Sequence, residues 1–170
     1  SEDDTRLVQV QQDLLIHNWR QVESSRAYPR YETVKAGFNE ALSKFNAFIT
    51  THELGNVEAM QYELSYVNFI AEGDGYRGLD AIRELLPDFA WRPGNSRFLP
   101  DPSSINYQTV FDLPDGNGKL RVSIQDALRK SDEKKLIRLL IMARGMPQSS
   151  GVQMPEHWFE LAHEWIVNAF

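Results

Sequence analysis

The feature that most constrains the fold is the turn Pro-Asp-Gly-Asn-Gly at residues 114–118, which separates two segments in which apolar and polar residues alternate. Asn and Gly accept the positive φ angles that hairpin turns require, and alternation is the pattern of half-buried strands. Residues 105–113 and 120–128 are therefore predicted to pair as an antiparallel hairpin. After a second turn at 131–134, residues 136–143 are almost continuously apolar, which predicts a central strand covered on both faces.

Residues 7–20 and 57–70 also alternate, and each segment is predicted to form one strand. Two other segments, within residues 34–49 and 158–169, repeat their apolar residues at helical spacing and are predicted to be amphipathic helices. The residues expected on one face of the first strand are Val8, Val10, Leu14 and Ile16. The stripe expected on the first helix comprises Val34, Phe38, Ala41, Leu42, Phe45, Phe48 and Ile49.

These elements predict an α+β fold, with a mainly antiparallel sheet of about five strands packed against two long helices. Two variants stay open: a helix-grip-like arrangement, and a sheet whose N-terminal strands are missing. A length of 170 residues suits a single α+β domain over residues 1–170. A fragment of a longer chain is the alternative, because the sequence enters a strand almost at once and has no initiator Met. Between the strands, residues 73–78 predict a mobile glycine connection, 79–86 a short helix and 89–104 an irregular loop.

The composition limits the classes of partner. There are 18 basic and 24 acidic residues, a net charge of −6, and the basic residues are scattered, so we do not expect nucleic-acid binding. The absence of cysteine excludes disulfides, thiolate metal sites and cysteine nucleophiles. No apolar run approaches the ~20 residues of a membrane span, and the N-terminus lacks a signal-peptide pattern. A cytoplasmic protein without membrane association is therefore expected.

No motif predicts a catalytic, metal or cofactor site. His157 and His163 are six residues apart on a predicted helix, so they cannot share a face as zinc-binding HExxH histidines do. The glycines within 73–78 have G-x-G-x-x-G spacing, but this motif binds nucleotides only within a parallel βαβ unit, which the predicted sheet lacks. Ser149 and Ser150 are better explained as part of a turn than as a nucleophile.

Polar residues on the predicted strands are the candidates for a binding site. Asn68 shares the parity of the apolar residues in its strand, so its amide should point into the apolar layer and need partners there. Arg138 and Arg144 share a parity on the central strand. A buried guanidinium requires a carboxylate or several carbonyls around it, and Glu63 is one possible partner. These residues form either an internal network or a ligand site. Arg144, at the end of its strand, is the best single candidate for contact with an anionic or polar ligand.

Six short motifs occur in order over nearly the whole chain: Gln11-Gln12-Asp13, Asn18-Trp19-Arg20, Tyr28-Pro29-Arg30-Tyr31, the strand Glu63–Asn68, the run Leu139–Gly145, and His163-Glu164. Together they resemble a sporadically distributed family of uncharacterised bacterial proteins. The resemblance implies a longer chain, with an upstream strand–helix portion and a tail beyond the last helix, and it implies no assigned activity. It draws attention, without assigning a chemical role, to Trp19, Arg20, Tyr28, Arg30, Tyr66, Asn68, Arg144 and His163.

Two function classes remain. The first is a non-catalytic binding or interaction module in which the surface around Trp19, Arg20 and Arg30 docks a protein partner, because Trp, Tyr and Arg dominate interface hot spots. A purely structural interpretation, in which Trp19 and Tyr31 plug the junction of sheet and helix, competes with it. The lack of a recognisable nucleophile, metal cluster or phosphate loop favours the interaction module over an enzymatic or small-molecule-binding domain.

The second class is a small-molecule-binding or enzymatic domain with a cavity between a curved sheet and a helix, lined by Arg144, Asn68 and Glu63. A pocket that holds both Arg144 and Asn68 would support this class, whereas a sealed core would argue against it. The sequence alone does not set the oligomeric state.

Overall fold

The computed structural model describes residues 4–22, 28–71, 73, 98, 102–146 and 155–169. The predictions for the later glycines of 73–78, for the helix over 79–86 and for most of the loop over 89–104 lie outside these residues. The chain divides into two units, residues 1–58 (unit 1) and 59–170 (unit 2), and each is described by itself. The prediction of one domain over the whole chain stays a prediction.

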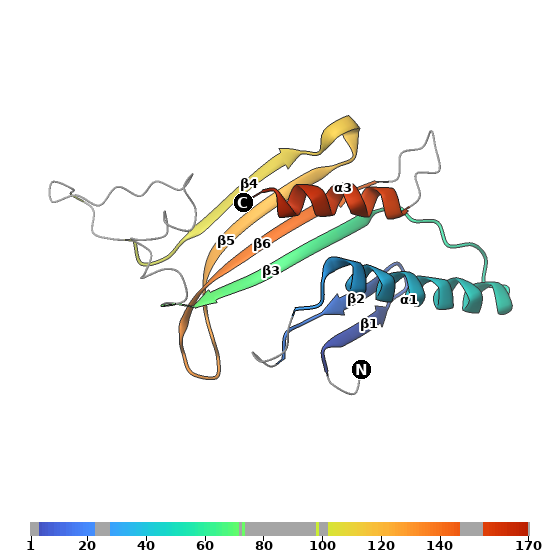
Figure 1. The fold of residues 1–170 in the computed structure, drawn as a ribbon, viewed down its shortest axis with the longest axis horizontal. Helices are drawn as coiled ribbons and strands as arrows, with labels where there is room; N and C mark the ends of the chain where they lie inside the picture. Colours follow the sequence, from blue (N-terminus) through green and yellow to red (C-terminus); the bar gives the residue numbers. More distant parts are fainter. Residues whose placement is uncertain are drawn as a thin grey trace. The chain divides into compact units, whose positions relative to one another are not determined.

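Unit 1 contains the antiparallel hairpin of β1 (Arg6–Val10) and β2 (Leu15–Trp19), followed by α1 (Tyr31–Thr51) (Figure 1). The prediction of a single strand over residues 7–20 is wrong, because the polar residues 11–13 form a turn in which the amide of Gln11 donates to the carbonyl of Leu14 over 2.8 Å. The hairpin register also changes the faces. Val8 and Val10 share a face with His17 and Leu15, and not with Leu14 and Ile16.

Helix α1 packs against β2. The predicted apolar stripe is half-buried, as expected for an amphipathic helix, except that Phe48 is exposed. Gly37 provides the closest approach: a Cβ atom there would lie 2.8 Å from Nε2 of His17. Tyr31, the first residue of α1, is its buried residue and anchors the start of the helix. The burial of Tyr31 at the start of α1 agrees with a structural role for this residue.

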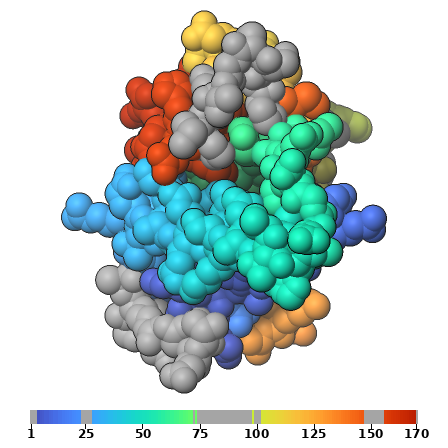
Figure 2. All heavy atoms as spheres, turned by 90° about the vertical axis from the view of Figure 1, so that its right-hand side faces the viewer, coloured from blue at the N-terminus to red at the C-terminus, as the bar shows by residue number. Residues whose placement is uncertain are grey.

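Unit 2 is built on an antiparallel sheet in the order β3 (Tyr62–Ala71), β6 (Lys135–Gly145), β5 (Lys119–Leu128), β4 (Asn106–Asp112). The predicted hairpin of β4 and β5 and the central place of β6 are confirmed. In the turn, positive φ angles fall on Asp115, Gly116 and Gly118, while Asn117 is right-handed helical. The strand predicted from Val57 begins only at Tyr62, and residues 52–61 are exposed throughout (Figure 2, cyan to green).

Helix α3 (Pro155–Val167) packs against β3, β5 and β6 and covers one face of this sheet (Figure 1). The core between them is sealed by fully or almost fully buried side chains, among them Ile124, Ile137, Ile141, Ala143, Trp158, Ala162 and Ile166. The prediction that the apolar strand β6 is covered on both faces is wrong. Its other face carries Leu140 and Met142, which are half-buried, and Arg144, which is exposed. Leu136 on this face is buried, so the face is covered in part and exposed toward Arg144. An antiparallel sheet can leave much of one face to solvent in this way.

The start of α3 meets the β4–β5 turn and the end of β6 at a close junction. The indole Nε1 of Trp158 donates to the carbonyl of Asn117 over 2.9 Å. A Cβ atom at Gly145 would lie 2.0 Å from that carbonyl oxygen and 2.5 Å from the indole nitrogen. Glycine is therefore required at position 145 by the approach of two other elements. The fold class is an α+β fold with antiparallel sheets, as predicted.

Candidate functional site

The candidate site is the face of the four-stranded sheet that points away from α3, called here the open face. Side chains alternate along each strand, and the register places the following residues on this face: Glu63, Ser65, Val67, Phe69 and Ala71 of β3; Leu136, Arg138, Leu140, Met142 and Arg144 of β6; Lys119, Arg121, Ser123, Gln125 and Ala127 of β5; and Asn106, Gln108, Val110 and Asp112 of β4. Its composition changes in rows across the strands.

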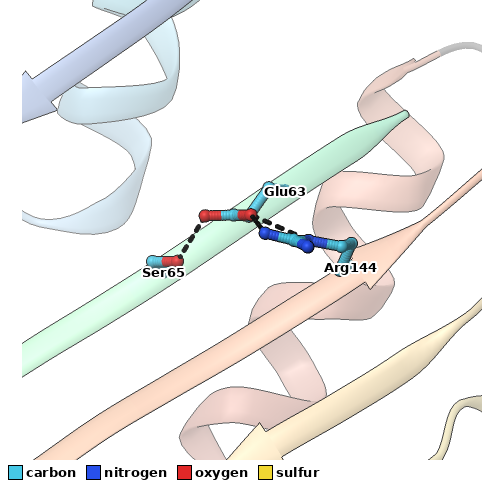
Figure 3. A network of polar contacts seen from close by, with 3 residues as sticks. All are labelled: Glu63, Ser65 and Arg144. Atoms are coloured by element: carbon cyan, nitrogen blue, oxygen red, sulfur yellow. Dashed lines mark hydrogen bonds and ion pairs between the residues drawn. The ribbon is translucent and has the colours of Figure 1, made fainter. Parts of the chain in front are cut away.

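The first row is charged and consists of two ion pairs. Nε and Nη2 of Arg144 donate to the same oxygen of Glu63, over 3.0 and 2.5 Å, and the hydroxyl of Ser65 donates to the other oxygen over 3.1 Å (Figure 3). Beside them, Lys119 pairs with Asp112. The predicted partnership of Arg144 with Glu63 is present. The side chains are 49% and 36% exposed, however, so the expected buried charge network is wrong, and this is a surface pair.

Beyond this row, the apolar residues of the open face lie mainly on β3 and β6. Val67 is 45% and Phe69 59% exposed, and Leu140 and Met142 beside them are half-buried. Val110 is 49% exposed and lies on β4, with Arg121 between it and Met142. At the end of β3, an open hollow of about 380 Å³ is lined by Phe69, Ala71, Leu128, Arg129 and Leu136. Large apolar side chains that lie next to one another on a sheet face, rather than singly, indicate a surface for another molecule.

Two arginines lie among these aliphatic residues. Arg138 is half-buried and reaches the side-chain oxygen of Gln125 at 3.5 Å, and Gln125 in turn donates to Asn106 over 3.3 Å. Arg121 is exposed. Within the described residues, no carboxylate pairs with either guanidinium. The sequence reasoning missed Arg121, although its position between the inward-facing Leu120 and Val122 was a signal that it points outward.

Asn68 lies on the opposite face, that of Tyr62, Leu64 and Tyr66, as its parity predicted. It is exposed, so the expectation of an amide inside the apolar layer is wrong. The strand β3 has ten residues and extends about 30 Å, whereas the thirteen residues of α3 extend about 20 Å, so the helix cannot cover the whole strand. Because Asn68 and Arg144 lie on opposite faces, one pocket on the sheet cannot hold both.

Tyr66 and His163 join the sheet to α3. The tyrosine hydroxyl lies 3.0 Å from Nδ1 of the histidine, within hydrogen-bond distance, and the two rings are nearly parallel with centroids 6.1 Å apart. Tyr62 packs its ring against Trp158 and Phe159 further along the same strand, and burial raises the pKa of its phenol. These contacts fix α3 to the sheet and explain two of the conspicuous aromatic residues as packing.

In unit 1, the rings of Trp19 and Tyr28 meet edge to face with centroids 4.9 Å apart. Trp19 is half-buried, while Arg20 and Arg30 are exposed. Arg20 donates through Nε to the carbonyl of Asp4 over 2.9 Å. The structure thus brings the two aromatic ends of the loop together, but Trp19 contributes less exposed surface than the docking hypothesis expected.

His17 lies on the α1 side of the hairpin against Gly37. Burial lowers the pKa of His17, and the positive charge of Arg6 lowers it further, so the imidazole is neutral at pH 7. Its Nδ1 is buried and has no hydrogen-bond partner. The imidazole of His17 is therefore best explained as a packing group.

Elsewhere on α1, the hydrogen bond and charge of Lys44 lower the pKa of Glu40, which is fully exposed.

In the part of the chain that the structure describes, no three His, Asp or Glu side chains come close enough to hold a metal ion. Neither described helix has an apolar stretch of the length that a bilayer crossing needs. Comparison of the sequence with family models and with curated proteins, and of the fold with solved structures, finds no match. Membership of the bacterial family therefore stays a prediction, and function has to be argued from the open face.

Proposed function

We propose that this protein is a non-catalytic interaction module, and that the open face of its four-stranded sheet packs against aliphatic side chains of a partner protein. The observation that carries the proposal is the exposure of Val67 and Phe69 beside Leu140 and Met142, with Val110 exposed on the same face at the opposite edge strand β4. The opposite face of the same sheet is an example of apolar side chains covered by a helix, since Trp158 and neighbouring apolar residues of α3 pack against it.

The energetic reason is the hydrophobic effect. Complete burial of an apolar side chain of this size contributes about 1.5 to 3 kcal/mol relative to leaving it exposed. The three side chains that are about half exposed, Val67, Phe69 and Val110, retain much of this free energy for an association. The ion pairs of Arg144 and Lys119 border these apolar residues at one end, so the face combines apolar and polar groups as protein interfaces do.

The cavity class has less support. Its candidate residues Arg144 and Glu63 lie on the open face and are bound to each other, while Asn68 lies on the other face. The layer between the sheet and α3, where the cavity was expected, is filled by buried side chains such as Ile124 and Ala162. The charge of Arg144 is already balanced by Glu63, so this residue is no longer the best candidate for an anion contact. Bacterial origin and cytoplasmic location stay predictions.

Site-specific photo-crosslinking tests the proposal. A photo-reactive amino acid is placed at Val67 in one protein and at Val110 in another, and a matched control carries it at Leu54, which is also exposed but lies in unit 1. We expect the two sheet positions, and not the control, to crosslink in host cells to aliphatic side chains of one and the same protein. That protein is then purified, and its affinity for Val67→Ser and Phe69→Ser variants is measured.

We expect each serine variant to bind the purified partner about tenfold more weakly, because 1.4 kcal/mol corresponds to a factor of ten. Crosslinks only within the chain, crosslinks to many proteins without a common segment, or unchanged affinity of the serine variants would each refute the proposal. Urea unfolding of the same variants confirms that they are folded.

A further inference from the structure

The two arginines of the open face indicate what kind of segment covers it. We propose, on the basis of the proposed function, that the partner segment is an acidic amphipathic helix whose carboxylates pair with Arg121 and Arg138 while its apolar stripe packs on Val67, Leu140 and Val110. The acidic character, the helical form and the spacing of the carboxylates each follow from the structure of this face.

The acidic character follows from the charges that the face leaves unbalanced. Arg144 is paired with Glu63 and Lys119 with Asp112, whereas no carboxylate within the described residues pairs with Arg121 or Arg138. A partner that packs on the aliphatic residues must remove water from both guanidinium groups. This desolvation is costly unless the partner supplies opposite charges and hydrogen-bond acceptors. Carboxylates satisfy guanidinium groups with two parallel hydrogen bonds, so Glu or Asp side chains are the complementary groups.

The helical form follows from the hydrogen bonds of the partner's own backbone. A sheet presents side chains, and not backbone groups, on its faces, because the backbone N–H and C=O groups point to neighbouring strands. A single segment that lies on the open face must therefore satisfy its backbone internally, which a helix does and an isolated strand does not. Helix α3 does this on the opposite face. A strand added at an edge of the sheet would not cover Arg121, which lies on the inner strand β5.

The spacing follows from the register. Arg121 is paired with Met142 and Arg138 with Gln125, so the two arginines lie on adjacent strands and four residues apart along them. Their Cα atoms are therefore about 14 Å apart. A helix rises 1.5 Å per residue, so this distance corresponds to about nine residues, and the nearest positions on one helix face are about seven and eleven residues apart. The long arginine side chains make up the difference. Aliphatic residues between the two carboxylates would then lie over Val67 and Leu140.

Binding of designed helical peptides tests this inference. Each fluorescently labelled peptide has about 20 residues, about 30 Å as a helix, and carries the same aliphatic stripe. In one peptide two glutamates are separated by about seven residues and in a second by about eleven, and matched peptides carry glutamine or lysine at those positions. Fluorescence anisotropy measures the affinity for the wild-type chain, for the double variant Arg121→Gln/Arg138→Gln, and for Lys119→Gln, a control that removes an already paired cation on the same face.

We expect a glutamate peptide to bind at least about tenfold more tightly than the glutamine peptide, and the lysine peptide to bind most weakly. The double variant should lose this preference without changing its affinity for the glutamine peptide, and Lys119→Gln should keep it. Raising the salt concentration should reduce the preference, since exposed charges are screened. Far-UV circular dichroism and urea unfolding show whether the variants keep the wild-type fold.

The outcomes separate this inference from the proposed function. Equal binding of all peptides, with a common loss in Val67→Ser, would overturn the acidic partner and leave the apolar interface. Binding of no peptide would overturn the acidic helix as occupant, while crosslinking from Val67 and Val110 decides the interface itself. Tighter binding of a single-stranded RNA oligomer than of any peptide, dependent on Arg121 and Arg138, would assign the two cations to phosphate groups and overturn the inference.

Discussion

Substitution of Gly145 by alanine tests the close junction between β6, the β4–β5 turn and α3. The added methyl group would lie 2.0 Å from the carbonyl oxygen of Asn117 and 2.5 Å from the indole nitrogen of Trp158, and the first of these atoms belongs to the backbone and cannot rotate away. The turn must therefore move, and the buried hydrogen bond from Trp158 to Asn117 must lengthen or break. Gly145→Ala is expected to destabilise the fold for both reasons.

The magnitude follows from two contributions. Overpacking of a close-packed site costs about 1 to 3 kcal/mol. A buried carbonyl left without its donor costs about 1 to 3 kcal/mol more. We therefore expect Gly145→Ala to lower the free energy of unfolding by roughly 2 to 6 kcal/mol, a large part of the total of about 5 to 15 kcal/mol that domains have. Urea unfolding followed by tryptophan fluorescence measures this free energy, and near-UV circular dichroism reports the environment of Trp158.

A double-mutant cycle with Trp158→Phe provides the control. Phenylalanine keeps an apolar ring at this position but removes the nitrogen that the new methyl group would meet, so part of the damage from Gly145→Ala should already be absent in the Trp158→Phe background. The two losses should then be non-additive by about 0.5 kcal/mol or more. An alanine variant within about 0.5 kcal/mol of the wild type, or strict additivity of the two substitutions, would refute the proposed geometry.

Three further predictions concern other parts of the molecule. Burial lowers the pKa of His17 below its ordinary value of 6.5, so below pH 6.5 the unfolded state binds a proton more readily than the folded state and the fold loses stability. Hydrogen exchange of the α1 amides, corrected for intrinsic exchange, should therefore accelerate from pH 7 to pH 5. The variant His17→Leu should show a weaker dependence on pH. Arg144→Ala and Glu63→Ala should each change the free energy of unfolding by no more than about 1 kcal/mol, and a double-mutant coupling of several kcal/mol in urea would show that the pair is not a surface pair. Tyr66→Phe should cost about 0.5 to 1.5 kcal/mol, measured by urea unfolding, through loss of its contact with His163, and an unchanged midpoint would contradict that contact.

The parts of the fold that the sequence predicts well are those set by local chemistry. The turn at 114–118 contains residues that accept positive φ, and the flanking strands begin and end within a residue of their predicted limits. Likewise, α1 follows from the spacing of its apolar residues, which a helix of 3.6 residues per turn places on one side. Tertiary contacts were not needed for either prediction, because the signal lies within a few neighbouring residues.

The break between β1 and β2 was missed although the sequence carries a signal for it. Gln11, Gln12 and Asp13 are three consecutive polar residues, and Gln12 stands at the parity of the apolar Val10 and Leu14, so the alternation is interrupted there. Only the pairing of Val10 with Leu15 shows that the faces are exchanged after the turn. Parity in the sequence therefore assigns a face correctly within one strand, as for Asn68, and incorrectly across a turn, as for Val8 and Ile16.

What the sequence pattern does not contain is the extent of the covering layer. Tyr66 and Asn68 are two residues apart on the same face of β3, yet one contacts α3 and the other is exposed. Similarly, Ile141 and Met142 are adjacent in one apolar run, but Ile141 is buried under α3 and Met142 lies on the open face. A run of apolar residues therefore predicts that both faces of a strand are apolar, but it does not show which element covers each face. One face of the sheet is covered by α3. The exposed apolar side chains of the other face, together with the unbalanced charges of Arg121 on β5 and Arg138 on β6, are the reason why we propose a second covering element from another protein.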